Sequence, residues 1–577
     1  MHGKLSPLLP WAIALLLALL LAGLVWSQRS AQQTGDSLVY ARSASTGERL
    51  LHPHHLLFNV TLRGCHLALG FLLGADDPVL SGQVHGVLFL LLGCLGVMAF
   101  ASLVLEEPWL GVGGLLLFGT LNGVMIDATQ VYAYVPAASL MVWAATAAMA
   151  PSRRLGGRCP WCPLAIAWSA GVLYHQINVL FAVPLAVLVA IRRERSERTR
   201  LVAAALAAGA VVLVAYVGAF QADGSARRHS FIQFCLDYAV NGSPTWGTAD
   251  NLDRVGATAI LRNQAACVTS PRHRLGWTLV ADLLLAAGLV VVAASRRSPE
   301  RLRAPAATCM AWWLTLLGFV WWWMPSGREI LLHTIPPALL GVLVLVAAAA
   351  DGSPTSRRRW AVLAVVVATA SLNLAVNLRG DVAARRQPDD ETSGVASDLA
   401  ELAPGRGLVV ARFAAVSAYR LRHQTPDQVS YSLSRLILVL HDGTHAPPLL
   451  ERARRGGVVV DLACLDPNVR YHRARGVDHP DLWARVVLWL VDALPAEGGR
   501  GLEVRSCSVQ VASSGRPYLV VDSTAPRLRV EGVAGAFRML QEAVRQGLGA
   551  DAPQIAFFDW DRIGGKHATP APARGPG

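Results

Sequence analysis

Acidic and imidazole side chains that could move protons follow soon after the first apolar run of the sequence. Asp36 and Tyr40 come first, and His52, His54 and His55 follow within the string LHPHHLL. A carboxylate with a modestly raised pKa can accept a hydroxyl proton, which makes Asp36 a candidate general base. Imidazoles can hydrogen-bond a phosphate or shuttle protons. A solvated loop would also tolerate these residues, but an acid followed by three histidines favours a functional site.

Other polar residues stand in short breaks between later apolar runs, where we expect them to reach the same face. Ionisable groups at or near membrane depth are costly and usually mark a pathway or a site. A guanidinium can bind a phosphate bidentately, so Arg328, together with His54 or His55, is a candidate phosphate clamp. His175 could position a donor substrate. The candidate substrate-binding residues in these breaks are Asp127, Gln130, His175, Gln176, Arg328 and Glu329.

The elements that position these residues are membrane helices. Of 577 residues, 53% are hydrophobic and 16% charged, with mean hydropathy +0.40, whereas soluble domains are about a quarter charged. The net charge of +13 does not indicate nucleic acid as a partner, because much of it lies in arginine clusters beside apolar runs. Several of those runs approach the roughly 20 residues that a spanning helix needs. The lipid bilayer is therefore the expected partner.

The apolar runs predict eleven membrane passes and an α-helical polytopic fold. The first is a retained helix rather than a cleaved signal, because no ordinary small-residue cleavage site follows it. The passes lie near 9–27, 84–105, 109–126, 132–150, 161–175, 177–191, 201–220, 276–295, 305–323, 329–350 and 360–379.

The arginine clusters predict the orientation in the inner (plasma) membrane. Arginine-rich short loops stay in the cytoplasm, which places the N-terminus inside. The transmembrane domain then covers 1–380, with a first outer loop at 28–83 and a large outer loop at 221–275. Everything after residue 380 lies outside the cytoplasm. The clusters lie within 153–158, 192–200, 296–303 and 357–359.

This orientation requires a short hairpin between two cytoplasmic clusters. Only 31 residues separate 151–160 from 192–200, so the chain must cross twice or dip in and return. His175 would lie at the tip, which is tolerated only where protein or a water-filled cavity surrounds it. The alternative is one long tilted helix, which would reverse every later loop.

Residues 381–565 predict an extracytoplasmic α/β domain, followed by a disordered tail at 566–577 that is rich in Pro, Ala and Gly. Short apolar runs indicate buried strands, and helical spacing indicates two helices. The strands are Gly407–Ala411, Gly457–Asp461 and Tyr518–Asp522, and the helices are 480–494 and 532–547.

Two pairs of cysteines could form disulfides in an oxidising compartment, although spacing alone does not prove either pair. Cys235 and Cys267 share the large outer loop, and Cys464 and Cys507 share the C-terminal domain. The Cys159-Pro-Trp-Cys162 motif could be a redox pair or half of a zinc site. A lone CxxC without a second ligand pair favours two membrane-edge thiols instead.

The first outer loop resembles that of GT-C membrane glycosyltransferases, of the protein O-mannosyltransferase and aminoarabinose-transferase type. The resemblance rests on Asp36, the downstream Tyr40 and the HPHHLL string. His175-Gln176 in a hairpin and the pattern WxPxxxE that ends at Glu329 are similar to patterns in uncharacterised members. It covers roughly residues 1–380.

The resemblance implies a GT-C-like fold and an inverting transfer of a sugar from a polyprenyl phosphate to an extracytoplasmic acceptor. Asp36 matches the position of the catalytic acid. Protein mannosyltransferases carry paired acids there, whereas Ser37 follows Asp36 here, so the acceptor class stays open. The loop shows no DxD motif, and we therefore expect no metal or other cofactor, only the lipid-linked sugar as co-substrate.

Two other functions fit parts of the sequence. A transporter or flippase would use intramembrane polar residues and a broken helix, but the polar groups gather at the outer face and no internal repeat is evident. A membrane-anchored interaction protein would act through its C-terminal domain, although eleven passes exceed what an anchor needs.

Overall fold

The computed structural model describes residues 8–548, with internal gaps that are given at the end of this paragraph. The chain forms two compact units, and each is described separately. The first holds Met1–Gln33 and Tyr40–Pro388, and the second holds Thr34–Val39 and Asp389–Gly577. The gaps are 157–158, 223–229, 237–246, 248, 271–274, 326, 352–355, 387–389, 404–407, 412, 423–428, 433–454, 463–491, 493 and 496–501.

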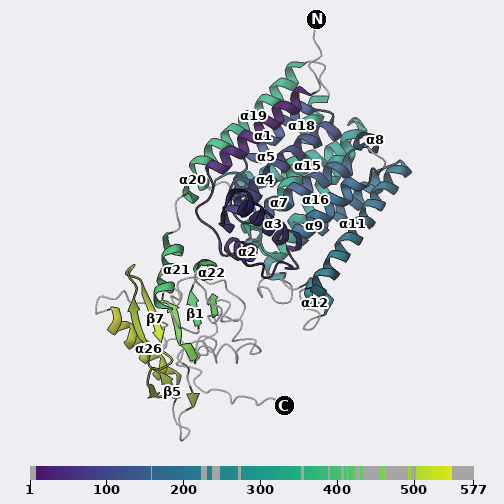
Figure 1. The fold of residues 1–577 in the computed structure, drawn as a ribbon. Coiled ribbons are helices and arrows are strands. Elements are labelled where there is room, and N and C mark those ends of the chain that lie inside the picture. Colours follow the sequence, from purple (N-terminus) through teal and green to yellow (C-terminus); the bar gives the residue numbers. More distant parts are fainter. Residues whose placement is uncertain are drawn as a thin grey trace. The chain divides into compact units, whose positions relative to one another are not determined.

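The first unit is a bundle of apolar helices that lie side by side (Figure 1). Its core is formed by α1, α4, α5 and α7, and α7 is buried along nearly its whole length. Its described elements up to the hairpin are α1 (Leu9–Ser27), α2 (Gly35–Thr46, which begins in the second unit), α3 (Leu56–Leu73), α4 (Pro78–Phe100), η1 (Ala101–Leu105), α5 (Pro108–Gly119), α6 (Asn122–Asp127), α7 (Tyr134–Met149), α8 (Ser152–Leu155), α9 (Cys162–Tyr174), η2 (Gln176–Phe181) and α10 (Ala182–Ile191).

The remaining elements of this unit complete the bundle and the large predicted outer loop. They are α11 (Arg195–Ala222), α12 (Phe231–Cys235), η4 (Ala249–Leu252), α14 (Arg254–Val268), α15 (Leu275–Ala294), α16 (Glu300–Trp323), α17 (Arg328–Leu331), η5 (Leu332–Thr334), α18 (Ile335–Asp351), α19 (Ser356–Arg379) and α20 (Asp381–Arg385).

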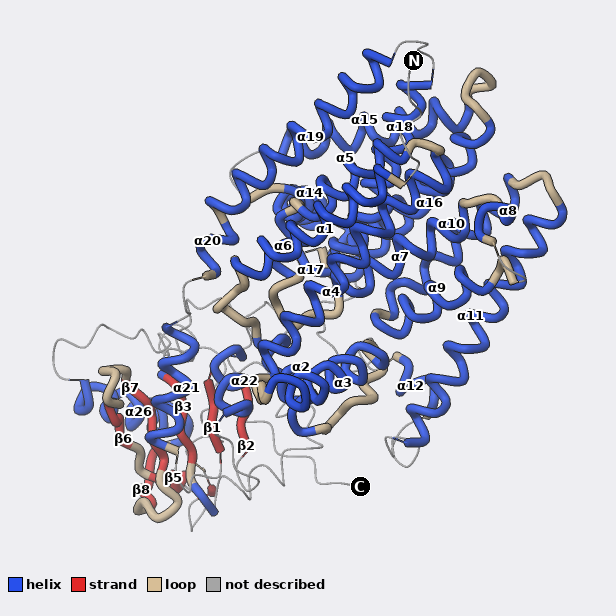
Figure 2. Tube along the Cα trace, turned by 45° about the horizontal axis from the view of Figure 1, so that its top comes forward, coloured by secondary structure: helices blue, strands red, loops and turns tan. Residues whose placement is uncertain are grey.

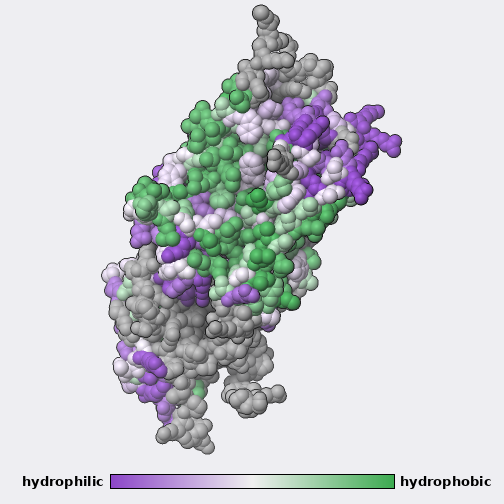
Figure 3. All heavy atoms as spheres, turned by 45° about the vertical axis from the view of Figure 1, so that its right-hand side comes forward, coloured by the Kyte–Doolittle hydropathy of each residue, from purple (hydrophilic) through white to green (hydrophobic). Residues whose placement is uncertain are grey.

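Every predicted pass coincides with an apolar helix or helix pair. Among the described residues, seven helices are long and apolar enough to cross a membrane, and five shorter apolar helices fill the other predicted passes. Figure 3 shows apolar side chains covering much of the bundle, with hydrophilic ones gathered at the end that carries α8 and the start of α11. The chain is therefore a multi-pass membrane protein.

One of the seven, α3, lies inside the predicted first outer loop and was not predicted as a pass. Its mean hydropathy is 1.6, against 2.6 for Pro78–Leu105, because Asn59, Arg63 and His66 interrupt its apolar residues. The interruptions explain why the sequence pattern did not single it out.

The predicted hairpin forms. Helix α9 ends at Tyr174, His175 is extended, and η2 and α10 return the chain. Arg192, at the end of α10, donates from Nη2 to the carbonyl oxygen of Met149 at 2.6 Å, beside the start of the hairpin. Both ends of the hairpin therefore lie together, and the alternative of one long tilted helix is wrong.

The second unit contains two small sheets, drawn in red in Figure 2. The larger has the order β2-β1-β3-β7-β6, with β1 parallel to β2 and β3 and with β7 antiparallel to β3 and β6. The smaller is antiparallel, in the order β4-β5-β8. Their bounds are β1 (Leu408–Ala411), β2 (Val429–Ser432), β3 (Val458–Asp461), β4 (Leu494–Pro495), β5 (Leu502–Arg505), β6 (Ser508–Val511), β7 (Pro517–Val521) and β8 (Arg527–Val530).

The described helices of this unit are α21 (Asp390–Leu402), α22 (Phe413–Arg422) and α26 (Gly532–Leu548). The three predicted strands are confirmed as β1, β3 and β7, and the helix predicted at 532–547 is α26. Tyr518 on β7 donates from its hydroxyl to Asp398 Oδ2 at 2.9 Å, which ties α21 to the sheet. The helix predicted at 480–494 lies mostly outside the described residues, and the tail at 566–577 lies wholly outside them.

Candidate functional site

The HPHH turn is packed against the end of the hairpin. His55 is the N-cap residue of α3, with φ −142° and ψ 43°, and is 4% exposed. Its Nδ1 lies 3.1 Å from the carbonyl oxygen of Tyr174, the last residue of α9. Because a carbonyl oxygen can only accept, Nδ1 carries the proton in this contact, and the Nε2 of the neutral ring is an acceptor.

His175 occupies the break between α9 and η2. Its backbone is extended, with φ −158° and ψ 119°, and its Nδ1 accepts a hydrogen bond from the backbone N–H of Ile177 at 3.3 Å. The Nε2 of the neutral ring therefore carries the proton and can donate it. Asn178 holds the break, since its Nδ2 donates to the carbonyl oxygen of Gly171 at 2.9 Å. The hairpin tip thus has a defined imidazole tautomer.

His333 reaches the same place from η5, between α17 and α18. Its side chain is 1% exposed, and neither ring nitrogen has a hydrogen-bond partner among the residues that the structure describes. Leaving a buried polar group unsatisfied costs about 1–3 kcal/mol, and in a native protein it calls for an explanation such as a ligand or water. His333 therefore has hydrogen-bonding capacity to offer.

The structure brings these histidines into one continuous group. The ring centroid of His175 lies 4.9 Å from that of His55 and 4.5 Å from that of His333. His52 and His54 lie 6.1 Å and 6.4 Å from His55. We call these five residues the histidine cluster. It joins segments of the chain that are more than a hundred residues apart.

Two imidazoles of the cluster, those of His54 and His55, are uncharged in the free protein. Burial lowers the pKa of His54 to about 2, with a further lowering from the neighbouring imidazoles of His55 and His52. Burial likewise lowers the pKa of His55 to about 3, against a small opposing effect of its contact with Tyr174. The two rings are therefore neutral donors and acceptors at physiological pH.

A buried ion pair lies in the turn between α6 and α7. Asp127, the last residue of α6, is 0% exposed, and Arg328 Nη2 donates to its Oδ1 at 3.0 Å. No described residue donates to Oδ2. Burial raises the pKa of the Asp127 carboxyl to about 7, although Arg328 and Arg385 oppose the rise. This carboxyl can therefore exchange a proton near neutral pH.

Two residues of α4 position the turn that carries Asp127. The buried Gln83 donates from Nε2 to the carbonyl oxygens of Ser30 at 2.8 Å and Thr129 at 2.9 Å. A Cβ atom on Gly86 would overlap the carbonyl oxygen of Ala128. Only glycine allows this close approach of helix and turn.

Other predicted residues lie around these groups. Tyr40 packs its ring edge-on against His55, with centroids 5.3 Å apart. The Nε2 of Gln176 donates to the carbonyl oxygen of Cys235 at 3.0 Å. Glu329 is half-buried next to Arg328, and its charge contributes to the raised pKa of Asp127.

Gln130 lies in the turn after α6, and Asp36 lies in the first turn of α2. Gln130 is buried and donates from Nε2 to the carbonyl oxygen of Gln32 at 3.3 Å, so it fixes the turn. Asp36 is exposed in the first turn of α2. It belongs to the segment Thr34–Val39 of the second unit, whereas the histidine cluster and Asp127 lie in the first. The predicted partner of Arg328 was a phosphate, and its partner in the structure is Asp127.

The structure corrects the cysteine predictions. Cys235 and Cys267 are both free thiols, because Cys267 is buried within α14 with its Sγ 3.5 Å from the carbonyl oxygen of Arg328. Cys507 is also free, and Cys464 lies outside the described residues. Cys159 and Cys162 form a disulfide, where the sequence favoured two thiols. Their positions three apart at the start of α9 bring the two sulfurs together.

Sequence reasoning did not assign His85 to the site. The hydroxyl of Tyr174 lies 3.2 Å from His85 Nε2 and 2.7 Å from Thr61 Oγ1, and the carbonyl oxygen of Tyr174 contacts His55. An ionisable residue inside the apolar run 84–105 was the signal that could have identified His85. Among the described residues, no three or more His, Cys, Asp or Glu side chains are placed to hold a metal ion.

No family model matches the chain, and neither does any curated protein. Solved structures do share its fold. One is ArnT from Cupriavidus metallidurans bound to undecaprenyl phosphate, with TM-score 0.52 and 13% identity over 89% of this chain and 98% of ArnT.

The oligosaccharyltransferase of Archaeoglobus fulgidus is similar in two states. The state tethered to an acceptor peptide has TM-score 0.53 and 11% identity over 92% of this chain and 77% of the enzyme. The complex with Zn and sulfate has TM-score 0.52 and 12% identity over 93% and 77%. The chain therefore shares its fold with these two membrane proteins, as the GT-C resemblance predicts.

Proposed function

We propose that this chain is an integral membrane glycosyltransferase that moves a sugar from a polyprenyl phosphate to an acceptor outside the cytoplasm. The observation that carries the proposal is the histidine cluster, in which His55, His175 and His333 converge from three segments of a GT-C fold. The ring of His333 is buried there, with no described hydrogen-bond partner. Such a group is suited to a polar ligand within a largely apolar bundle.

The ligand class follows from the fold and from the chemistry of the cluster. The ArnT structure of the same fold holds undecaprenyl phosphate, and the archaeal oligosaccharyltransferase holds an acceptor peptide. Neutral imidazoles can donate hydrogen bonds to phosphate oxygens, and the negative charge of the donor's phosphodiester would favour their protonated forms. We therefore assign the histidine cluster to the phosphate of the donor.

The transfer step needs a base and a leaving group. A carboxylate takes the proton of the acceptor hydroxyl, whose oxygen attacks the anomeric carbon. The bond from that carbon to the phosphate oxygen breaks, and polyprenyl phosphate leaves with the electron pair. Attack opposite the leaving group inverts the anomeric centre. Asp36 is the proposed base, from the sequence resemblance. Hydrogen-bond donors stabilise the negative charge on the departing phosphate in the transition state.

Arg328 can contribute in a pH-dependent way. Its guanidinium is paired with a carboxyl whose pKa is raised to about 7 by burial. Protonation of Asp127 would leave the guanidinium charge for an incoming phosphate. The Arg328 guanidinium could thus exchange the Asp127 carboxylate for the phosphate of the donor.

The test uses the full chain in detergent with polyprenyl phosphates that carry hexoses or pentoses. Release of polyprenyl phosphate and formation of a glycosylated product from envelope extract are measured by mass spectrometry. Removing a general base should lower the rate roughly 10²–10⁴-fold, so Asp36→Asn should lose turnover while remaining folded. His175→Gln should weaken donor binding, because it removes an imidazole from the centre of the cluster.

Matched variants control for general damage. Asp76→Asn changes a carboxylate of the same predicted outer loop whose side chain is 97% exposed. His66→Gln changes a buried histidine outside the cluster, bonded to Ser81. Both should retain turnover. An Asp36→Asn variant as active as the natural protein would refute the base assignment. Movement of the lipid-linked sugar across a vesicle membrane, with no glycosylated product, would indicate a flippase instead of a transferase.

A further inference from the structure

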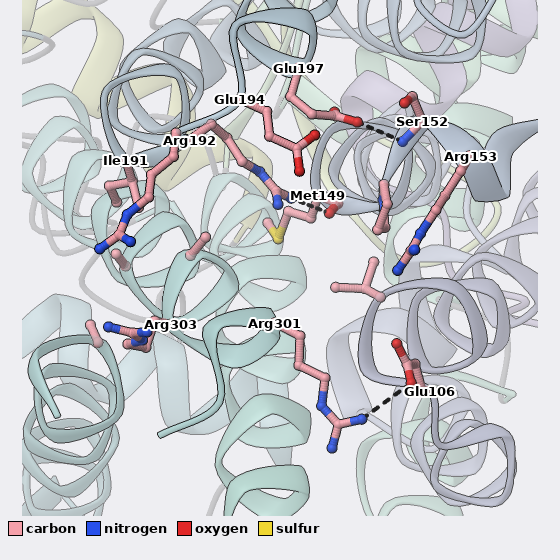
Figure 4. Close-up of a pocket in the computed structure, with 16 residues that line it drawn as sticks. Glu106, Met149, Ser152, Arg153, Ile191, Arg192, Glu194, Glu197, Arg301 and Arg303 are labelled. Carbon is pink, nitrogen blue, oxygen red and sulfur yellow. Dashed lines mark hydrogen bonds and ion pairs between the residues drawn. The ribbon is translucent and has the colours of Figure 1, made fainter. Parts of the chain in front are cut away.

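A charged cavity lies at the end of the bundle where the predicted cytoplasmic arginine clusters meet. It has a volume of about 740 Å³ and is bounded by residues of η1, α8, α11, α15, α16 and the turn after α10. Figure 4 shows arginines from separate elements around it, with Glu194 and Glu197 along one side. It contains none of the residues of the histidine cluster.

The lining carries an excess of positive charge. Arginines contribute five groups and glutamates three. Two of these glutamates are already engaged, because Glu197 is bonded to Arg200 Nε at 2.9 Å and Glu106 is paired with Arg301 at 3.3 Å. The charge that remains is therefore mostly cationic. The five lining arginines are Arg153, Arg192, Arg193, Arg301 and Arg303.

Three of these arginines have no acidic partner among the described residues, namely Arg153, Arg193 and Arg303. The Nε of Arg303 is buried and lacks an acceptor within the described part of the chain. A guanidinium is a planar donor that matches the oxygens of a phosphate, and charge-assisted bonds to it are strong. The arrangement is suited to an anion with several oxygens.

Part of the lining is apolar. Val104, Met149 and Ile191 lie at the ends of their helices, and Ala304 and Ala307 of α16 also line the cavity. A soluble anion needs only the arginines, whereas a lipid places its phosphate among them and its chains along the apolar helix ends. Basic pockets between membrane helices are typical headgroup sites.

We propose that this arginine cavity is a phosphate-binding site, filled in the membrane by the headgroup of an anionic lipid. The site does not depend on the transferase proposal. Arg153 and Arg303, which Figure 4 draws on opposite sides of the cavity, supply guanidinium donors from two sides. Glu194, which has no described ion-pair partner, weakens the site by its charge.

The experiment measures binding to the full chain in nanodiscs of phosphatidylcholine. Phosphatidylglycerol and inorganic phosphate are the two probes, followed by native mass spectrometry and by competition. Removing two guanidinium groups in Arg153→Gln/Arg303→Gln should weaken phosphatidylglycerol binding at least about tenfold. Arg297→Gln, an exposed arginine of the same end that does not line the cavity, should bind as the natural protein does.

A variant with the opposite expected effect on binding controls for misfolding. Glu194→Gln removes a negative charge from the lining and should tighten binding, which a damaged fold would not do. Preference for phosphatidylglycerol over phosphatidylcholine supports the lipid as source. Binding of inorganic phosphate without that preference supports the same site with a soluble ligand. Failure to bind either probe, or equal losses in Arg297→Gln and the double variant, overturns the proposal.

Discussion

Replacing the buried carboxyl of Asp127 by an amide should change how stability depends on pH. Burial raises its folded-state pKa from 3.8 to about 7, so the folded protein holds this proton more tightly than the unfolded chain does. The resulting stabilisation is complete below pH 3.8 and is lost as the pH rises towards 7. At about 1.4 kcal/mol for each pH unit in that window, the loss amounts to about 4 kcal/mol.

Asp127→Asn resembles the protonated carboxyl in shape and charge. The variant should therefore match the natural protein near pH 4 and become relatively more stable as the pH rises, by about 4 kcal/mol at pH 8. Thermal unfolding in detergent between pH 4 and 8 measures this gap. Comparing the two proteins is essential because His54 and His55 change stability with pH in the opposite direction to Asp127. Their lowered pKa values destabilise the fold as the pH falls below 6.5, and this effect cancels in the difference.

The result that would refute this reasoning is a constant gap across the whole pH range. It would show that the Arg328 guanidinium offsets the burial of Asp127 and leaves its pKa near the ordinary value. A variant that loses stability relative to the natural protein at high pH would show that the ion pair dominates. Glu531→Gln, with its exposed side chain, should follow the natural protein at every pH and so controls for surface charge.

Three further changes test separate parts of the structure. His55→Gln should reduce the loss of stability between pH 6.5 and about 3, because the folded protein keeps this imidazole neutral; the same unfolding series shows it, and an unchanged acid limb contradicts it. Gly86→Ala should destabilise the protein by about 1–3 kcal/mol through overlap with the neighbouring turn, whereas Gly64→Ala, which has open space, should not; equal unfolding temperatures would count against the packing argument. Alkylation after denaturation without reductant should label both Cys235 and Cys267, since both are free thiols; peptide masses that lack both labels would show a disulfide.

The passes and the hairpin could be predicted because both depend on local sequence. Apolar length sets where a helix can cross, and the arginines around 151–160 and 192–200 required the chain to return within 31 residues. That constraint placed His175 on the same side as the HPHH string. The rings of His55 and His175 are 4.9 Å apart in the structure. His55 also contacts Tyr174, which lies 119 residues further along the chain.

The partners of the charged residues could not be predicted. Arg328 and Asp127 are 201 residues apart, and their pairing depends on how α6 and α17 both pack against α14, which no short pattern encodes. The same holds for Cys267, whose burial in α14 decides against a disulfide. Strand β7 was predictable as an apolar run, but its antiparallel place between β3 and β6 was not, because strand order depends on contacts across the sheet.

The histidine cluster and the proposed arginine cavity differ in how charge becomes available to an anion. Burial and mutual repulsion keep His54 and His55 neutral, with pKa values near 2 and 3, so these two rings offer no cation that a soluble anion could neutralise. A phosphate that enters this cluster favours protonated rings, and its binding must take up protons and strengthen as the pH falls. The guanidinium groups of Arg153 and Arg303 stay charged throughout that range, so anion binding there should respond to salt and hardly to pH. Opposite responses to pH and salt would therefore distinguish a site for the reacting phosphate from a site that anchors the protein to lipid.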